Sequence, residues 1–320
     1  MRRFAILAAF WLAGLSGAAA QDTFPSRTLK IIVPFAVGGP TDLVARVLGE
    51  AMSQDLRQPV IVENRPGANG NVATEAVAKS DPDGYTLLYN SSHVAINPGI
   101  YAKLPFDPRK DLAPVSLTAT LPLVVALNPE VPAKSMKEFI DYVKERPGKL
   151  SYGSGGVGNV THLAVELLLR KYGLEVVHAP YRGTAPALAA VASGHIQFST
   201  DAVNSAQGLV NGGQVRGLVV FGTTRSPVIP NVPTMEESGL EKLEIGAWQG
   251  VMVAGGTPKA IVERLHGSVV KAMGTANVRE KLAVQGATIL ATTPEEYARY
   301  LDEEIVRWTK VAREAGIKAE

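Results

Sequence analysis

Two glycine-rich loops carry the residues of this sequence that could do chemistry. The first loop contains Phe35, Ala36, Gly38 and Gly39, and it separates a strand-like run from a helix-like run. Glycines let backbone N–H groups approach a ligand closely, and the N-terminus of the following helix favours an anion. The loop has no lysine, so it is not a nucleotide P-loop, and it suits a small carboxylate. The alternative is a tight connection that holds no ligand.

The second loop offers side-chain donors at the start of another helix. Ser154, Asn159 and Thr161 stand around Gly158. A carboxylate at this place would accept charge-assisted hydrogen bonds from hydroxyl, amide and backbone N–H groups. Ordinary N-capping, which needs only one of these side chains, is the alternative. We predict these four residues as ligand contacts.

Residues at the ends of other predicted strands complete the candidate site, because ligands of open α/β sheets bind at the carboxyl ends of the strands. Asn90 and Ser91 form a polar loop after the third strand, and Tyr181 ends a later one. Asp201 ends a further strand and could select an amine or a hydroxyl of the ligand. Phe35 could cover the ligand or fill the core.

Patterns typical of catalysis or metal binding are missing from the sequence. The five histidines form no H-x-x-x-H or H-E-x-x-H pair, which argues against a metal site. Ser154 is not part of a G-x-S-x-G motif, because Tyr152 occupies the first glycine position. No G-x-G-x-x-G run sits in a dinucleotide-binding unit. We therefore predict no catalytic residue, no metal and no cofactor.

The elements that must position the two loops are similar. Residues 29–33 form an apolar, β-branched run of strand length, and helical spacing begins at Thr41. The same order of strand, glycine loop and helix recurs at residues 150–152 and 162–172. Strands and helices alternate along much of the chain, which favours an α/β fold with sheets flanked by helices. The repeat suggests two similar domains, each offering one loop to a shared cleft.

Composition indicates an exported protein without nucleic-acid partners. Residues 1–20 read as a signal peptide cleaved near Ala20, because Arg2 and Arg3 precede a short apolar run and small residues. The 32 basic residues include these two arginines, so the mature chain has 30 basic and 30 acidic residues. Such a balance gives no overall field for nucleic acid. An exported chain without cysteine fits a bacterial periplasm.

Several motifs in order give the chain a family resemblance. They are residues 33–42 (VPFAVGGPTD), 62–67 (VENRPG), 83–88 (DGYTLL), 152–154 with 161–164 (YGS and THLA) and 180–183 (PYRG). With these motifs the chain resembles the Bug-type periplasmic receptors of tripartite tricarboxylate transporters. The resemblance implies a two-lobed clamshell that holds a carboxylate through backbone amides and hydroxyls of two facing loops, without catalysis. Many relatives have Thr or Ser where this chain has Asn159.

The resemblance and the repeat together predict the domain organisation. Residues 21–121 and 223–320 form lobe one, and residues 122–222 form lobe two. The resemblance implies a solute receptor for a small organic acid, which could be a di- or tricarboxylate, an acidic amino acid or an aromatic acid. It also implies membrane transporter subunits as partners, and we expect a monomer. The alternatives are an exported hydrolase that uses Ser154, or a sensor for a membrane histidine kinase.

Overall fold

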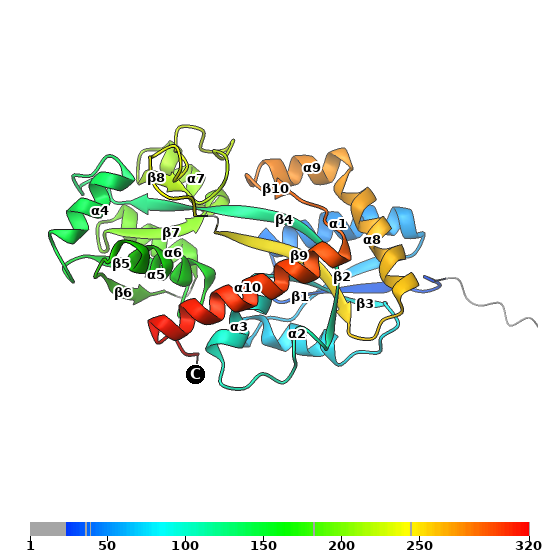
Figure 1. The fold of residues 1–320 in the computed structure, drawn as a ribbon. Coiled ribbons are helices and arrows are strands. Elements are labelled where there is room, and N and C mark those ends of the chain that lie inside the picture. The colour runs from blue at the N-terminus through cyan, green and yellow to red at the C-terminus, as the bar shows by residue number, and fades with distance from the viewer. Residues whose placement is uncertain (1–23, 36, 39, 182, 244, 320) are drawn as a thin grey trace, which may run out of the picture.

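The computed structural model describes residues 24–35, 37–38, 40–181, 183–243 and 245–319 (Figure 1). The predicted signal peptide and the predicted site residues Ala36 and Gly39 lie outside these ranges. In chain order the elements are β1 (Leu29–Val33), α1 (Pro40–Leu56), β2 (Val60–Asn64), η1 (Ala68–Gly70), α2 (Asn71–Ala78), β3 (Thr86–Ser91), α3 (His93–Ile100), β4 (Leu112–Leu127), α4 (Met136–Lys144), β5 (Ser151–Ser154), α5 (Val160–Tyr172), β6 (Val177–Pro180), α6 (Thr184–Ala192), β7 (Phe198–Ala202), α7 (Val203–Asn211), β8 (Arg216–Val220), β9 (Gly246–Ala254), α8 (Lys259–Met273), α9 (Ala276–Ala283), β10 (Thr288–Ile289) and α10 (Pro294–Ala315).

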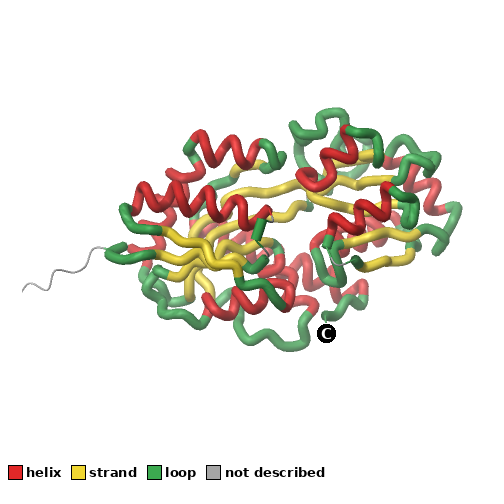
Figure 2. The backbone as a smooth tube through the Cα atoms, turned by 180° about the vertical axis from the view of Figure 1, so that it is seen from behind, coloured by secondary structure: helices red, strands yellow, loops and turns green. Residues whose placement is uncertain are grey.

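Lobe one is built on β2, β1, β3, β9 and the first part of β4, in that order across the sheet. β1 is parallel to β2 and β3, and β9 is antiparallel to β3 and β4. Ile31 and Val33 are buried in one cluster with α1, α8 and α9, whereas Ile32 is buried in another with α2, α3 and α10. Side chains of a strand alternate between faces, so helices cover both faces of this sheet (Figure 2).

Lobe two repeats this layered arrangement on a smaller sheet. The last five residues of β4 pair with β7, β7 pairs with β5, and β5 pairs with β6, while β8 pairs with β4. Leu188 of α6 and Val203 of α7 pack on one face beside Val124. Phe139 of α4 and Leu163 of α5 pack on the opposite face. The α/β clamshell predicted from the sequence is confirmed.

The long strand β4 connects the lobes without a break (Figure 1). Its residues up to Pro122 pair with β9, and its residues from Leu123 onward pair with β7. Proline has no N–H to donate to a ladder. Pro122 therefore stands where the strand exchanges its partners, between the sheet of lobe one and the sheet of lobe two.

The segment after β8 has contacts with lobe two. Asn211 Nδ2 donates to the carbonyl of Val228 at 3.0 Å, and Val220 bridges to Thr234. The Ile245 amide donates to the carbonyl of Phe221, and β9 begins at the next residue. The boundary between residues 222 and 223 stays a prediction, and from these contacts we propose that the chain crosses back to lobe one near residue 245.

Helix α10 begins at a capping box. Thr293 Oγ1 accepts from the Glu296 amide at 3.2 Å, and the Glu296 side chain accepts from the Thr293 amide at 2.9 Å. One face of the helix is buried through Tyr297, Leu301, Ile305 and Trp308, which are spaced by four, four and three residues. Within the described part of the chain, no helix is both long enough and apolar enough to cross a membrane.

Candidate ligand-binding site

A small cavity lies between the lobes, beside both predicted loops. Its volume is about 50 Å³, far below the roughly 300–1,000 Å³ of typical ligand sites. Lobe one contributes Phe35, Asn69, Ser91, Ser92, His93, Ile96 and Ala247, and lobe two contributes Gly158, Asn159 and Val160. The structure thus brings together four predicted site residues, namely Phe35, Ser91, Gly158 and Asn159.

The lobes touch directly beside this cavity. A Cβ atom at Gly158 would lie 2.4 Å from Cδ1 of Ile100 in α3, so a side chain there would require Ile100 to shift. Gly158 also has a φ of +75°, a conformation that favours glycine. Because the contact joins lobe two to lobe one, a ligand of several carbon atoms can enter only when the lobes move apart.

The first loop is organised around the buried carboxylate of Asp42. The carboxylate accepts from the Gly38 amide at 2.8 Å, from Arg46 Nε at 3.0 Å and from Asn64 Nδ2 at 2.9 Å. Burial alone would raise the pKa of Asp42, but these hydrogen bonds outweigh burial and lower it. The Gly38 amide, which we predicted as a ligand donor, is therefore occupied by Asp42 in this conformation.

His93 joins three segments of lobe one at the cavity wall. Its Nε2 is 3.0 Å from Thr74 Oγ1, and its Nδ1 is 3.3 Å from Ser91 Oγ. The Phe35 ring packs against it edge to face, with centroids 5.5 Å apart. Burial lowers the pKa of His93 to about 3, so the imidazole is neutral near pH 7. His93 therefore shapes the wall without adding a charge.

The second loop presents the N-terminus of α5 to the cavity. Asn159 caps the helix, because its Oδ1 accepts from the Thr161 amide and from Thr161 Oγ1, both at 3.0 Å. Thr161 Oγ1 in turn accepts from the Gly155 amide at 3.0 Å. Thr161 is therefore engaged inside its own loop and does not line the cavity. The Nδ2 atom of Asn159 takes no part in the cap and remains a potential hydrogen-bond donor.

Ser154 and His178 form a hydrogen-bonded pair behind this loop. Ser154 Oγ is 2.7 Å from His178 Nε2 and also accepts from the Gly156 amide at 3.2 Å. The His178 ring stacks on His162 with centroids 3.9 Å apart. Burial lowers the pKa of His178 to about 4. Ser154 is only 1% exposed and does not line the cavity, so the pair supports the loop from inside.

Three further predicted residues lie away from the cavity lining. Asn90 is fully buried, and its Oδ1 accepts from the Tyr297 hydroxyl of α10 at 2.9 Å. The Tyr181 amide donates to the carbonyl of Ser154, which joins β6 to β5. Asp201 is buried, and its Oδ1 accepts from the Ala202 amide at 2.7 Å. Burial raises the pKa of Asp201 to about 7.

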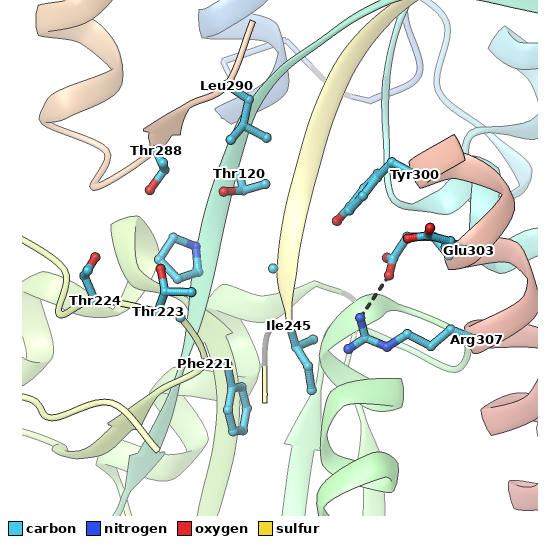
Figure 3. A pocket seen from close by; sticks show the side chains of 14 residues that line it. Thr120, Phe221, Thr223, Thr224, Ile245, Thr288, Leu290, Tyr300, Glu303 and Arg307 are labelled. Carbon is cyan, nitrogen blue, oxygen red and sulfur yellow. Dashed lines mark hydrogen bonds and ion pairs between the residues drawn. The ribbon is translucent and has the colours of Figure 1, made fainter. Parts of the chain in front are cut away.

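A larger groove of about 450 Å³ lies at the hinge, outside the predicted site (Figure 3). It is lined by residues of both crossing strands, such as Thr120 and Gly246, and by α10. The Arg307 guanidinium in this groove is paired with Glu304 at 2.9 Å. Glu304 also accepts from Nε1 of Trp248 and Nε1 of Trp308. Because the Arg307 guanidinium and the Glu304 carboxylate already form an ion pair with each other, we propose the interlobe cavity as the ligand site.

The interlobe cavity is lined by five polar and five apolar residues and carries no formal charge among the described lining residues. Its hydrogen-bonding side chains are amides, hydroxyls and a neutral imidazole. Two helix N-termini, those of α1 and α5, follow the loops beside it. Uncharged donors and helix N-termini can hold an anion without a buried cation. This arrangement suits recognition of a carboxylate.

The sequence analysis missed six lining residues, which are Asn69, Ser92, His93, Ile96, Val160 and Ala247. Asn90 and Ser91, which we predicted as a loop, are the last two residues of β3, and Ser92 and His93 continue this polar run. The run is the sequence signal from which Ser92 and His93 could have been predicted as site residues. Asn69 stands in the glycine-rich turn after β2. The apolar members carry no such signal, because only tertiary packing brings them to the cavity.

Comparison with known proteins identifies the family. The family model described as "Tripartite tricarboxylate transporter family receptor" matches residues 44–317. Protein BugT of Bordetella pertussis is 35% identical over 308 residues, covering 96% of this chain and 94% of BugT. These matches span both lobes.

Two solved structures have the same fold. A Rhodopseudomonas palustris protein solved with adipate is 33% identical, covers 92% of this chain and 99% of its own, and has a TM-score of 0.81. MatC of the same organism, solved with bound malate, is 36% identical. The match covers 90% of this chain and 99% of MatC, with a TM-score of 0.76. Family match, relatives and fold agree, and the chain belongs to the tripartite tricarboxylate transporter receptor family.

Proposed function

We propose that this chain is a periplasmic receptor that captures a small organic carboxylate between its lobes and delivers it to membrane transporter subunits. The observation that carries the proposal is the meeting of two strand–loop–helix units, one from each lobe, at an uncharged cavity with amide, hydroxyl and imidazole groups in its wall. Relatives solved with adipate and malate support a carboxylate as the ligand class.

Binding by this receptor couples to movement of the lobes. The ligand enters the separated form, and its contacts with both loops stabilise the closed form, in which Gly158 packs against Ile100. A ligand shifts such an equilibrium only as far as it prefers one form. Contacts to both lobes give that preference, and the closed form is the one we expect the membrane subunits to recognise.

The hydrolase alternative has one observation in its favour, the contact between Ser154 and His178. A nucleophile must also reach its substrate and have donors for the developing oxyanion. Ser154 is buried, and the neighbouring Gly155 and Gly156 amides are already bonded to Thr161 and Ser154. We therefore propose a receptor without catalytic activity. A sensor for a histidine kinase would share this fold and needs a separate test of transport.

Export to the periplasm follows from the predicted signal peptide. We expect the mature chain to begin near Gln21 and to remain a monomer. Mass spectrometry of the secreted protein would give the first residue, and light scattering would give the mass in solution.

A thermal-shift screen tests the binding function. Ligands that bind only the folded state raise the melting temperature by mass action, so at least one of the di- and tricarboxylates, acidic amino acids and aromatic acids should raise it. The bound acid should be recovered unchanged after release, which separates a receptor from an enzyme. A screen in which no acid moves the melting curve would contradict the carboxylate proposal.

A further inference from the structure

We propose that Asn69 determines the specificity of this receptor by accepting a hydrogen bond from a hydroxyl or ammonium group of the ligand. The inference rests on the proposed function, because it concerns the same cavity. Asn69 of lobe one and Asn159 of lobe two both line the cavity. Asn69 belongs to a third loop, residues 67–70, which lies between β2 and α2.

The third loop has an unusual backbone conformation. Four consecutive residues have positive φ angles, namely Gly67 at 140°, Ala68 at 46°, Asn69 at 49° and Gly70 at 86°. L-residues other than glycine rarely adopt this region, and Ala68 and Asn69 both do. Backbone strain of this kind persists only where the surrounding structure enforces it, and it clusters at ligand sites.

Asn97 of α3 holds the loop in place. Its Nδ2 donates to the Asn69 carbonyl at 3.0 Å and to Asn71 Oδ1 at 2.7 Å, and its Oδ1 accepts from Asn69 Nδ2 at 2.8 Å. Asn97 is fully buried. Its three hydrogen bonds therefore fix the backbone of Asn69 and the direction of the Asn69 side chain.

The His93 ring packs directly against the same loop. A Cβ at Gly70 would lie 2.6 Å from His93 Cδ2, so the backbone rests directly on the imidazole. Thr74 Oγ1 donates to the Gly70 carbonyl at 2.9 Å and contacts His93 Nε2 at 3.0 Å. The loop is thus pre-organised before any ligand arrives, which lowers the entropic cost of using it as a contact.

The hydrogen-bonding capacity of Asn69 then indicates the ligand chemistry. Its Nδ2 is committed to Asn97, while its Oδ1 accepts no hydrogen bond from any described residue. An amide oxygen repels a carboxylate oxygen and accepts from a hydroxyl or an ammonium group. Asn159, whose Nδ2 is a hydrogen-bond donor, lines the same cavity. The pair therefore suits an acid that bears a donor beside its carboxylate.

Calorimetry with matched acids tests this assignment. The probes are succinate against malate and aspartate, glutarate against 2-hydroxyglutarate, and phenylacetate against mandelate. For whichever series binds, the donor-bearing acid should bind about three- to tenfold more tightly, the usual worth of one hydrogen bond. Malate and aspartate distinguish a hydroxyl from an ammonium donor. Equal affinities within every pair that binds would overturn the assignment.

The variant Asn69→Gly removes the acceptor, and glycine tolerates a φ of +49°. It should reduce the ratio of the two affinities, donor-bearing acid over plain acid, to about one. Ala68→Gly is the matched control, since it changes the neighbouring residue of the same loop and should keep the preference. A preference retained in Asn69→Gly, or lost equally in Ala68→Gly, would refute the inference. Failure of every acid to bind wild type would instead reject the proposed function itself.

Discussion

Asp201 shows how burial changes a single residue. It is the penultimate residue of β7, it is 1% exposed, and its Oδ2 makes no hydrogen bond within the described part of the chain. A buried carboxylate without full hydrogen bonding favours its protonated form. The pKa of Asp201 is accordingly raised to about 7.

The variant Asp201→Asn should stabilise the protein at neutral and alkaline pH. Between about pH 4 and pH 7 the folded state keeps a proton that the unfolded state releases, so wild-type stability falls as pH rises through this window. The resulting loss in the wild-type free energy of unfolding is at most about 4 kcal/mol, since one pKa unit corresponds to about 1.4 kcal/mol. Denaturant unfolding at pH 4, 6 and 8 measures it.

The variant should therefore gain stability over wild type progressively from pH 4 to pH 8. Asp302→Asn is a suitable control, because Asp302 is 59% exposed in its surface pair with Arg109 and should show little gain. A difference between Asp201→Asn and wild type that does not change with pH would contradict the buried acid.

At the scale of elements, the N-terminus of α5 combines helix capping with a place in the wall of the interlobe cavity. Asn159 Oδ1 caps the helix, and the same side chain lines the cavity. Ser135 does the capping alone for α4, where its Oγ accepts from the Glu138 amide at 3.2 Å. The two helices therefore provide a matched comparison between a cap with a second role and a cap without one.

The variant Asn159→Asp should separate the two roles. Aspartate caps helices as well as asparagine does, so stability should stay within about 0.5 kcal/mol. The Nδ2 donor is replaced by a charged acceptor that repels a carboxylate, so affinity for the identified acid should fall more than about tenfold, or about 1.4 kcal/mol. Calorimetry and thermal unfolding measure the two effects.

Ser135→Asp is the control, because it also replaces a cap with an aspartate and adds one negative charge to lobe two. It should leave affinity unchanged. Similar losses of affinity in both variants would mean that the net charge of lobe two, and not the position of Asn159, determines binding.

At the scale of the whole molecule, the contact between Gly158 and Ile100 allows a test of the lobe closure that we propose. The variant Gly158→Ala places a methyl group against Ile100 Cδ1 and should disfavour the closed form. It also carries a backbone cost of about 1–2 kcal/mol, because of the positive φ at this residue. Affinity should fall, and small-angle scattering with saturating ligand should show a more extended molecule.

The variant Ile100→Val separates these two causes, because it removes the Cδ1 atom that the new methyl group would meet. In the double variant the steric part of the loss should be regained, whereas the backbone part should remain. A double-mutant cycle measured by calorimetry gives the coupling. Additive losses in this cycle would show that the lobes do not close through this contact.

The pattern of residues along the chain was sufficient for most elements. The strand at 29–33 and the capping box at Thr293 are local features, because apolar runs, caps and turns depend on neighbours in sequence. Helix α3 was missed, since the polar run at Asn90 reads as a loop and Pro98 stands inside the helix. The packing of α3 against α10 overrides that local signal.

The sequence by itself determined the two strand–loop–helix units and their glycines, because each unit depends on residues close together in the chain. Only the tertiary structure decided which groups reach the cavity. Asp42 occupies the Gly38 amide, and Asn97 Oδ1 accepts a hydrogen bond from Asn69 Nδ2. The physical reason is that a hydrogen-bond donor has few partners, and folding brings in competitors from distant segments that no local pattern reveals.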